Sequence, residues 1–470
     1  MDGSIQIDSN GEKKPRVDSM DNDGGQDFIS NLPESIIDQI LSLLPTKDAL
    51  RTCVLSKDWE YKWTGIYNIY INDVDRFSLR STRKTSVVNC VDRIFILSRN
   101  SNIRRFCLLC HQKYDTRRMI TWISAALMRN VEELEIVCKY EGVVVPRCLF
   151  YCTRLTSLKL QMPCSFRPIQ NWFSNLKVLY LAQVEILNEH APNTNQLVFN
   201  FPVLETFKLE SCRWLKVTFV EIHAPSLTNF YLQKNTDLPE VDSFQIKISR
   251  AKLGKFEFHG SCLEKFDLSA SSVFCASIHF QGYYQDHEEI RKNGLNGQLL
   301  LKKCSGLNHL QLSGAMVEAI VLSKQGSPLP KLDMVKHLEI FTSCTSEAFL
   351  EFLHSTPSLE RIRLNVWLWN DYDYDLVELI PSCILLHLKE VQFNGFKGEQ
   401  RHVHLADFLL RNAGGLKKMS GLSRKKSEEN QAEKNFWTRL KVAFGNGDLV
   451  VASSRKNMEK MAEFERYFGS

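Results

Sequence analysis

The sequence predicts an α/β chain in which a three-helix N-terminal unit is followed by a long solenoid. Two patterns support this fold class. Apolar residues recur at helical spacing between Leu32 and Trp63. Further along, short triplets with the spacing apolar-x-x-apolar-x-apolar recur, most of them about 21 to 29 residues apart. We therefore expect a parallel sheet on the concave face of the solenoid, with helices and loops outside it.

The first segment, residues 1–26, is polar, rich in Gly, Asp and Ser, and shows no hydrophobic periodicity. Such a composition buries too little apolar surface to offset the entropy of ordering, so we expect disorder here.

Residues 27–64 should form three helices. Pro33 suits the first turn of a helix, where a missing N–H costs nothing. The apolar stripe from Ile36 to Leu44 follows, and Pro45 ends it. Thr46 is placed to cap a second helix, and Ser56 to cap a third, short one.

This unit of roughly 37 residues is too small to bury all of its apolar surface alone. Two interpretations are open. The unit is an ordinary helical cap on the domain behind it, or it is a docking module whose exposed apolar face binds a partner.

The pattern LP-x-x-II-x-x-IL-x-x-LP-T-K-D-A-L-R-T-x-x-LS-K-x-W-x-x-x-W resembles an F-box in the form common in plant proteins. The resemblance implies docking on the Skp-type adaptor of an SCF ubiquitin ligase. The chain departs from the family pattern at Asp58, Glu60 and Lys62. By resemblance, the adaptor-binding positions include Leu32, Pro33, Ile36, Ile40, Leu44, Pro45, Leu50, Val54, Leu55 and Trp59.

Residues 65–328 carry most of the triplets, whose spacing is the leucine-rich-repeat period. The alternating half of each triplet is a strand with one face inward, and stacked repeats share one core. The triplets ending at Phe258 and Leu268 are only 10 residues apart, so we expect strand–loop turns there without a helix. A strand near 277–280 and a helix over roughly 285–304 should follow.

Residues 329–420 resemble the FBD region that closes many plant F-box/leucine-rich-repeat proteins. The matching residues near its end run from Phe396 and Gly398 to Met419. An amphipathic helix from Leu405 to Leu416 is expected to cap the open sheet edge.

Two other segments are less regular. The stretch VWLWNDYDYD holds Trp367, Trp369, Tyr372 and Tyr374, and is a candidate exposed hot spot or simple edge packing. Residues 421–470 form a charged tail with possible helices, which either lie on the last repeats or bind a partner.

The residues that flank the core positions of each strand should point to the concave face. This mixed-sign face is either merely solvated or a substrate-recognition surface. The candidate substrate-binding residues are Arg105, Lys159, Tyr180, Lys208, Tyr231, Glu257, His309 and Arg363.

The composition argues against several classes of protein. A net charge of +5 is too mild to indicate a nucleic-acid partner, and no apolar run is long enough for a membrane span. The fourteen cysteines mostly lie singly in apolar runs, without a signal peptide, which favours reduced thiols and a nuclear or cytoplasmic location.

No motif for catalysis or for a cofactor stands out. Cys107, Cys110 and His111 spell C-x-x-C-H, but within a repeat strand, so we expect neither haem nor zinc. No phosphate-binding loop, dinucleotide fingerprint or nucleophile elbow occurs. We therefore expect no cofactor, no metal and no catalytic centre.

Together the two resemblances imply a non-catalytic substrate-recognition adaptor of an SCF-type ubiquitin ligase. The helical unit would dock a Skp-type adaptor and, through it, cullin, while the solenoid would bind an unknown protein substrate. Two alternatives are open: a scaffold that binds a Skp-type protein outside any ligase, and a small-molecule co-receptor of the leucine-rich-repeat type.

Overall fold

The computed structural model describes residues 29–74, 83–100, 102–168, 173–187, 195–234, 245–249, 251–263, 265–268, 272–280, 287–304, 306–324, 328–342, 344–365, 379–395 and 400–422. The expected disordered N-terminus, the aromatic stretch 367–374, Phe396 and Gly398, and the charged tail beyond Leu422 lie outside these ranges.

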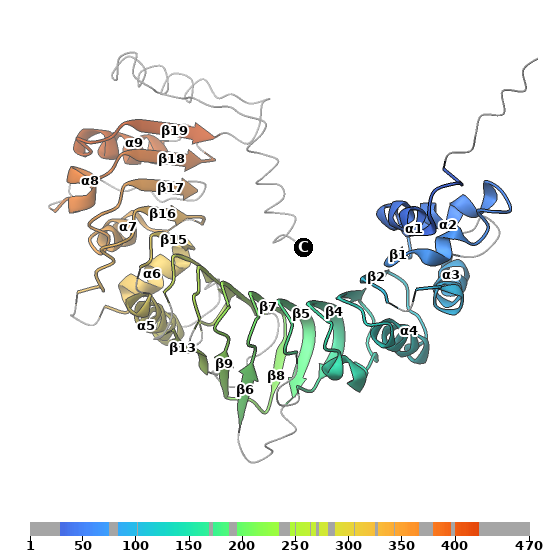
Figure 1. Cartoon of the computed structure of the whole chain (residues 1–470). Coiled ribbons are helices and arrows are strands. Elements are labelled where there is room, and N and C mark those ends of the chain that lie inside the picture. The colour runs from blue at the N-terminus through green and yellow to red at the C-terminus, as the bar shows by residue number, and fades with distance from the viewer. Residues whose placement is uncertain are drawn as a thin grey trace, which may run out of the picture.

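The chain forms a curved solenoid whose inner wall is one long parallel sheet (Figure 1). Within the described ranges this sheet has 15 strands, and its path follows the order of the chain. The strands on this path are β1 (Asn68–Asn72), β2 (Arg105–Cys110), β3 (Glu133–Cys138), β4 (Ser157–Phe166), β5 (Val178–Leu187), β7 (Thr206–Glu210), β10 (Asn229–Gln233), β12 (Lys255–Gly260), β14 (Cys275–Phe280), β15 (His309–Leu312), β16 (His337–Ile340), β17 (Arg361–Asn365), β18 (Glu390–Asn394) and β19 (Lys418–Leu422). The short strand β8 (Arg213–Leu215) lies off the path, beside β5.

The predicted triplets explain this arrangement. In β4, burial alternates strictly along the strand, with Leu158 and Leu160 inside. The first residue of the same triplet, Leu155, is also buried, below the strand. Each repeat thus contributes two strand residues and one turn residue to a continuous core.

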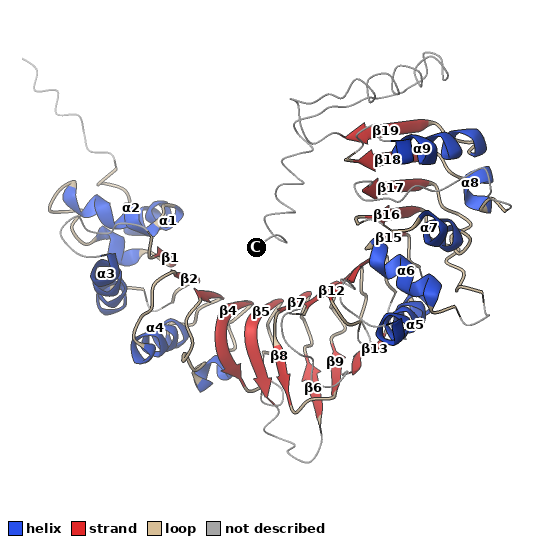
Figure 2. Ribbon diagram, turned by 180° about the vertical axis from the view of Figure 1, so that it is seen from behind, coloured by secondary structure: helices blue, strands red, loops and turns tan. Residues whose placement is uncertain are grey.

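The helices lie outside the sheet at both ends of the arc (Figure 2). They connect successive strands, because a parallel pair needs a crossover connection. Their bounds are α3 (Arg83–Leu97), α4 (Thr116–Met128), η3 (Arg147–Tyr151), α5 (His287–Lys303), α6 (Gly314–Leu322), α7 (Ser346–Leu353), α8 (Ser382–Leu386) and α9 (Gln400–Asn412).

The middle of the outer wall is a second parallel sheet, a feature that the sequence patterns did not predict. It contains β6 (Gln196–Asn200), β9 (Phe219–His223), β11 (Gln245–Ser249) and β13 (Lys265–Asp267), in the order β13-β11-β9-β6. In these repeats a second strand, and not a helix, returns the chain along the outside. Phe266, placed by its triplet in a repeat strand of the inner sheet, belongs to this outer sheet through β13.

Several other expectations can be compared with the structure. Among the described residues between the triplets at Phe258 and Leu268 there is no helix, while β14 and α5 match the strand and the helix expected after them. The helix expected to cap the sheet edge is α9, but it ends at Asn412. The residues after it form β19, which pairs with β18, so a strand rather than a helix ends the described sheet.

The N-terminal unit consists of α1 (Glu34–Leu43), α2 (Thr46–Arg51) and two 3-10 helices, η1 (Thr52–Val54) and η2 (Lys62–Gly65). No α-helix begins at Ser56, so the third helix takes the form of a turn followed by η2. Ile37 and Leu41 of α1 and Trp63 of η2 belong to the same core cluster as the repeats. The unit is therefore the first layer of the solenoid. Among the described helices, none combines the length and apolar composition needed to span a bilayer.

Candidate functional site

The apolar stripe of α1 divides into two faces. Ile37 and Leu41 are each 1% exposed and pack inward, whereas Ile36 and Ile40, one position earlier, remain well exposed. Residues four apart lie on the same side of a helix, so Ile36, Ile40 and Leu44 form an outward row. Half of the stripe thus joins the core and half faces solvent.

Further exposed apolar side chains lie on the same unit. Val54 and Leu55, at the end of η1, are 82% and 66% exposed. Leu43 is also exposed. Such a concentration of exposed apolar residues on one small unit indicates an interaction site. We define the N-terminal apolar surface as Ile36, Ile40, Leu43, Leu44, Val54 and Leu55.

The remaining predicted adaptor-binding residues are placed differently. Pro33 and Pro45 are exposed, whereas Leu32 and Leu50 are half-buried against the core. Trp59 is only 9% exposed, and its indole N–H donates a 2.7 Å hydrogen bond to the hydroxyl of Ser30. The structure therefore places Trp59 inside the unit.

Charged side chains fasten the unit to the first repeat. The guanidinium of Arg99, just after α3, donates to Glu34 at 2.8 Å and to Asp38 at 3.0 Å. The hydrogen bond from Arg99 holds the pKa of Glu34 below its ordinary value, with a smaller contribution from Lys62. Partial burial raises the pKa of Asp38 in spite of Arg99. The orientation of the unit on the solenoid is thus set by several contacts.

The three departures from the family pattern lie in different environments. Asp58 and Glu60 are exposed. The ammonium group of Lys62 lies 3.5 Å from the Glu34 carboxylate, so its charge is used within the unit.

At the centre of the concave face, three predicted residues come together. Tyr180, Lys208 and Tyr231 occupy the same register position on β5, β7 and β10. The Lys208 ammonium lies 4.9 Å from the ring centroid of Tyr180 and 4.6 Å from that of Tyr231, within cation–π range. Burial raises the pKa of Tyr231, so this phenol stays neutral at physiological pH.

Glu210 completes this cluster and was not among the predicted site residues. Its carboxylate lies 2.6 Å from the Lys208 ammonium and accepts a hydrogen bond from the Tyr180 hydroxyl. Glu210 is two residues after Lys208, so strand alternation alone puts it on the same face.

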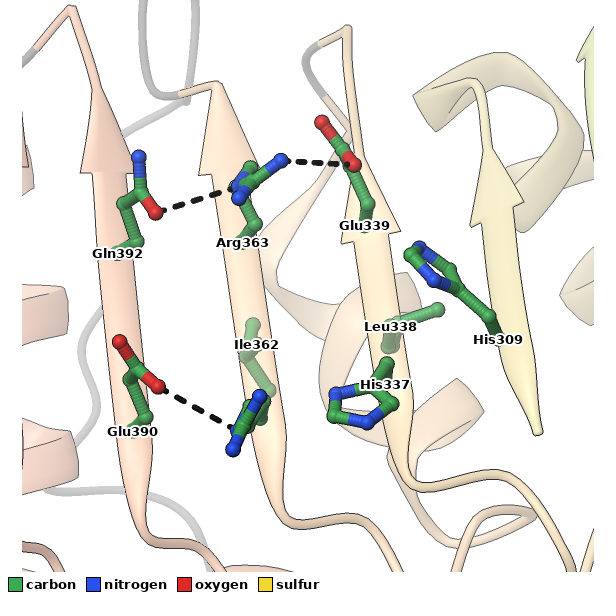
Figure 3. A pocket seen from close by; sticks show the side chains of 9 residues that line it. His309, His337, Leu338, Glu339, Ile362, Arg363, Glu390 and Gln392 are labelled. Carbon is green, nitrogen blue, oxygen red and sulfur yellow. Dashed lines mark hydrogen bonds and ion pairs between the residues drawn. The ribbon is translucent and has the colours of Figure 1, made fainter. Parts of the chain in front are cut away.

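A hollow of about 320 Å³ opens in the concave face over β15 to β18 (Figure 3). Its size is at the lower end of the range for ligand pockets. At the floor lie the strand positions of Leu338 and Ile362, whose side chains are buried in the core. The polar wall consists of His309, His337, Glu339, Arg361, Arg363, Glu390 and Gln392.

Ion pairs and hydrogen bonds cross the hollow from strand to strand. Arg363 lies between Glu339 and Gln392, with a distance of 3.3 Å to each (Figure 3). Arg361 is 3.4 Å from Glu390. Burial lowers the pKa of both His309 and His337, so neither imidazole adds charge at pH 7.

The hollow brings together only two of the predicted substrate-binding residues, His309 and Arg363. The others are distributed over the rest of the face: Arg105 pairs with Glu133 and Glu135, Lys159 lies in register with Glu135, and Glu257 pairs with Lys255. Arg361 and Glu390 were not among those candidates, although each precedes a core strand residue and alternation places it on this face.

The C-x-x-C-H segment is explained by the fold. Cys107 and Cys110 are three residues apart on β2, so their side chains point to opposite faces. His111 Nδ1 lies 2.9 Å from Asp73, whose carboxylate also accepts the backbone N–H groups of His111 and Gln112. Over the described part of the chain, no three His, Cys, Asp or Glu side chains gather as metal ligands would.

Three family models match the chain. The F-box domain matches residues 29–68, and the model described as FBD matches residues 378–420. Residues 119–251 match the LRR repeats of FBD-associated F-box protein At5g56370. The matches follow the order of N-terminal unit, solenoid and final repeats.

Similar full-length proteins occur in Arabidopsis thaliana. F-box/LRR-repeat protein At4g14103 is 31% identical over 360 residues, which cover 73% of this chain and 92% of that protein. F-box/FBD/LRR-repeat protein At3g14710 is 28% identical over 406 residues, covering 83% and 86%. Putative F-box/FBD/LRR-repeat protein At1g66300 is 26% identical over 453 residues, covering 90% and 96%.

Proposed function

This chain belongs to the plant family of F-box/LRR-repeat proteins with a C-terminal FBD, and we propose that it docks a Skp-type adaptor through its N-terminal apolar surface. Membership of this family implies, in general, a substrate-recognition adaptor of an SCF-type ubiquitin ligase. Such adaptors are typically non-catalytic. In this proposal the adaptor also links the chain to cullin, and the concave face holds a protein substrate.

The exposure of Ile36, Ile40, Val54 and Leu55 is the observation that carries the proposal. Covering an exposed apolar side chain by a partner removes it from water, and the favourable free energy is about 25 cal/mol per Å² of apolar surface buried. The inward half of the same stripe packs on the solenoid core, so the outward half is available for a partner while the unit stays folded.

In this proposal the solenoid contributes to ubiquitin transfer by positioning the substrate. The unit and the repeats share one core, and Arg99 ties them together, so a substrate on the concave face is held in a fixed relation to the adaptor. Holding a substrate lysine near a charged conjugating enzyme raises its effective concentration, and ubiquitin transfer is then chemistry of the partner subunits.

A double substitution in the N-terminal apolar surface, compared with a control substitution at a similarly exposed residue, tests this proposal. We expect the double variant Val54→Asp with Leu55→Asp to reduce co-purification with a recombinant Skp-type adaptor at least tenfold. Leu386→Asp is the control, because Leu386 is 68% exposed, close to the 66% of Leu55, but lies in α8 at the far end of the solenoid. The melting temperature measured by circular dichroism should be the same for the wild type, the double variant and the control.

Two results would argue against the proposal. Adaptor binding that survives the double variant would remove the docking role of this surface. In a second experiment, cullin is supplied together with the adaptor and the wild-type protein. If the protein binds the adaptor but cullin does not join the complex, a scaffold outside the ligase is favoured.

A further inference from the structure

We propose that the hollow over β15 to β18 binds an extended acidic segment of the substrate, with two carboxylates two residues apart. The inference rests on the proposed function, because it assigns a substrate class to the concave face. It is carried by Arg361 and Arg363, which lie on the same face of β17 and both line the hollow.

The spacing of the two guanidinium groups sets the spacing of the ligand. Residues two apart on a strand are separated by about 6.6 Å, and so are alternate side chains of an extended peptide. A peptide that runs along β17 therefore presents one carboxylate to Arg361 and the next carboxylate on the same side to Arg363. A side chain between them points away from the sheet.

Both arginines remain accessible beside their existing ion pairs. Arg361 and Arg363 each approach one carboxylate oxygen at 3.4 and 3.3 Å, and their side chains are 59% and 49% exposed. The partner carboxylates are less exposed, at 28% for Glu390 and 18% for Glu339, so the accessible side of each pair is the arginine. A guanidinium has five N–H donors, of which Arg363 uses only Nε and Nη1 in the hollow. A bidentate carboxylate would be held more strongly than the present single contacts.

The displaced glutamates keep other partners. Glu390 lies 2.9 Å from Lys418, closer than its 3.4 Å from Arg361. Glu339 accepts a 3.1 Å hydrogen bond from the side-chain amide of Gln311. With a ligand carboxylate on the arginines, Glu390 keeps its ion pair with Lys418, and Glu339 keeps the neutral hydrogen bond from Gln311.

The rest of the hollow suits a peptide. Leu338 and Ile362 line the floor from the strands, and their side chains point into the core. His309 and His337 occupy the same register position on adjacent strands, with ring centroids 5.7 Å apart, and add hydrogen-bonding nitrogens beside Arg361. A volume of about 320 Å³ accommodates a few side chains and not a folded domain.

Fluorescence polarisation with the full-length protein tests the inference. The probe is a labelled peptide in which two glutamates flank one threonine within a neutral Ser/Thr/Gly sequence. We expect saturable binding that weakens at least tenfold in Arg361→Gln and in Arg363→Gln. Arg213→Gln is the control, because Arg213 pairs with Glu185 of the neighbouring strand at 3.3 Å and is 57% exposed, yet lies outside the hollow. This control should change the affinity less than twofold.

Peptide variants separate the acidic pattern from general charge. A peptide with lysines in place of the glutamates, and one with three residues between the glutamates, should each bind at least tenfold more weakly. Three results would overturn the inference. The peptide shows no saturable binding, or Arg213→Gln weakens binding as much as the substitutions in the hollow. The third is that the protein binds only a peptide with a single phosphorylated residue in place of the two glutamates. None of these results affects adaptor co-purification, so failure of the inference is distinguishable from failure of the proposed function.

Discussion

The backbone N–H of Tyr70 donates a 2.7 Å hydrogen bond to the side-chain hydroxyl of Thr46. Tyr70 lies on β1, the first strand of the long sheet, whose outer edge has no further strand among the described residues. Thr46, expected to cap α2, is instead its first residue, after Pro45. Its hydroxyl occupies a position on the sheet edge, and the Ser42 hydroxyl accepts the Tyr67 N–H in the same way, at 3.1 Å. The N-terminal unit therefore covers an edge that would otherwise expose unpaired backbone groups.

Thr46→Val should loosen this edge while keeping the shape of the side chain. Thr46 is fully buried, so the Tyr70 N–H loses its acceptor without gaining water, at a cost of about 1–3 kcal/mol. Amide hydrogen exchange should become faster in β1, with little change in β16. The exposed Thr121 on α4 provides the control, and Thr121→Val should leave β1 exchange unchanged. Equal exchange of β1 in the wild type and in Thr46→Val would contradict the role of this bond.

Trp59→Ala should destabilise the N-terminal unit, because Trp59 is a core residue here. Truncating a buried tryptophan costs about 3–5 kcal/mol, and the bond to Ser30 is lost as well. Limited proteolysis should then cleave within residues 29–66 in the variant. Leu55→Asp changes only an exposed side chain and should remain resistant. Equal resistance of both variants would show that Trp59 does not support the unit.

Asp73→Asn should destabilise the start of the solenoid. Asp73 is fully buried, and one of its oxygens accepts both backbone N–H groups of His111 and Gln112 at 2.7 Å. An asparagine has a single acceptor oxygen, and its amide group meets His111 Nδ1 where a carboxylate oxygen was. The free energy of unfolding measured in urea should fall by about 1–3 kcal/mol.

The neighbouring residue provides a comparison for Asp73. Asn72 accepts one exposed N–H, from Val74, at 3.2 Å. Asn72→Ala should therefore cost about 0.5 kcal/mol, in line with a single exposed hydrogen bond. If Asp73→Asn and Asn72→Ala lower the free energy of unfolding by similar amounts, the buried contacts of Asp73 stabilise the fold no more than one exposed hydrogen bond.

His279→Phe should make the protein more resistant to acid. Burial lowers the pKa of His279 from 6.5 to about 4 in the folded chain. The unfolded chain therefore binds more protons between these values, and stability contributed by the neutral ring above pH 6.5 is lost as the pH falls toward about 4. Phenylalanine cannot titrate and keeps the ring contact with Phe341, whose centroid is 4.8 Å away.

The comparison is made by urea unfolding at two pH values. The measured quantity is the free energy of unfolding of His279→Phe minus that of the wild type. This difference should be about 2 kcal/mol more favourable to the variant at pH 5 than at pH 7.5. His354 is exposed, and His354→Gln should show no such difference. The same relative stability of His279→Phe at both pH values would contradict this assignment.

Much of the fold could be predicted because strand and repeat periodicity are local. In each triplet the alternating residues, such as Leu158 and Leu160, must share one face, and the long spacing between triplets requires a parallel crossover. The family resemblance located the N-terminal unit from residues within a single stretch. The concave positions of Lys208, Tyr231 and Arg363 followed from the same alternation.

Sequence patterns alone predict the repeats, the inner face of each strand and the apolar stripe of the first helix. Packing of the folded chain sets the inward position of Ile37 and the exposed position of Ile36, since a stripe that wide can be buried from either side. It alone placed Phe266 in a second sheet and gathered His309, Arg361 and Glu390 around one hollow. These outcomes depend on which strands pair and in which register, and packing across distant repeats sets both.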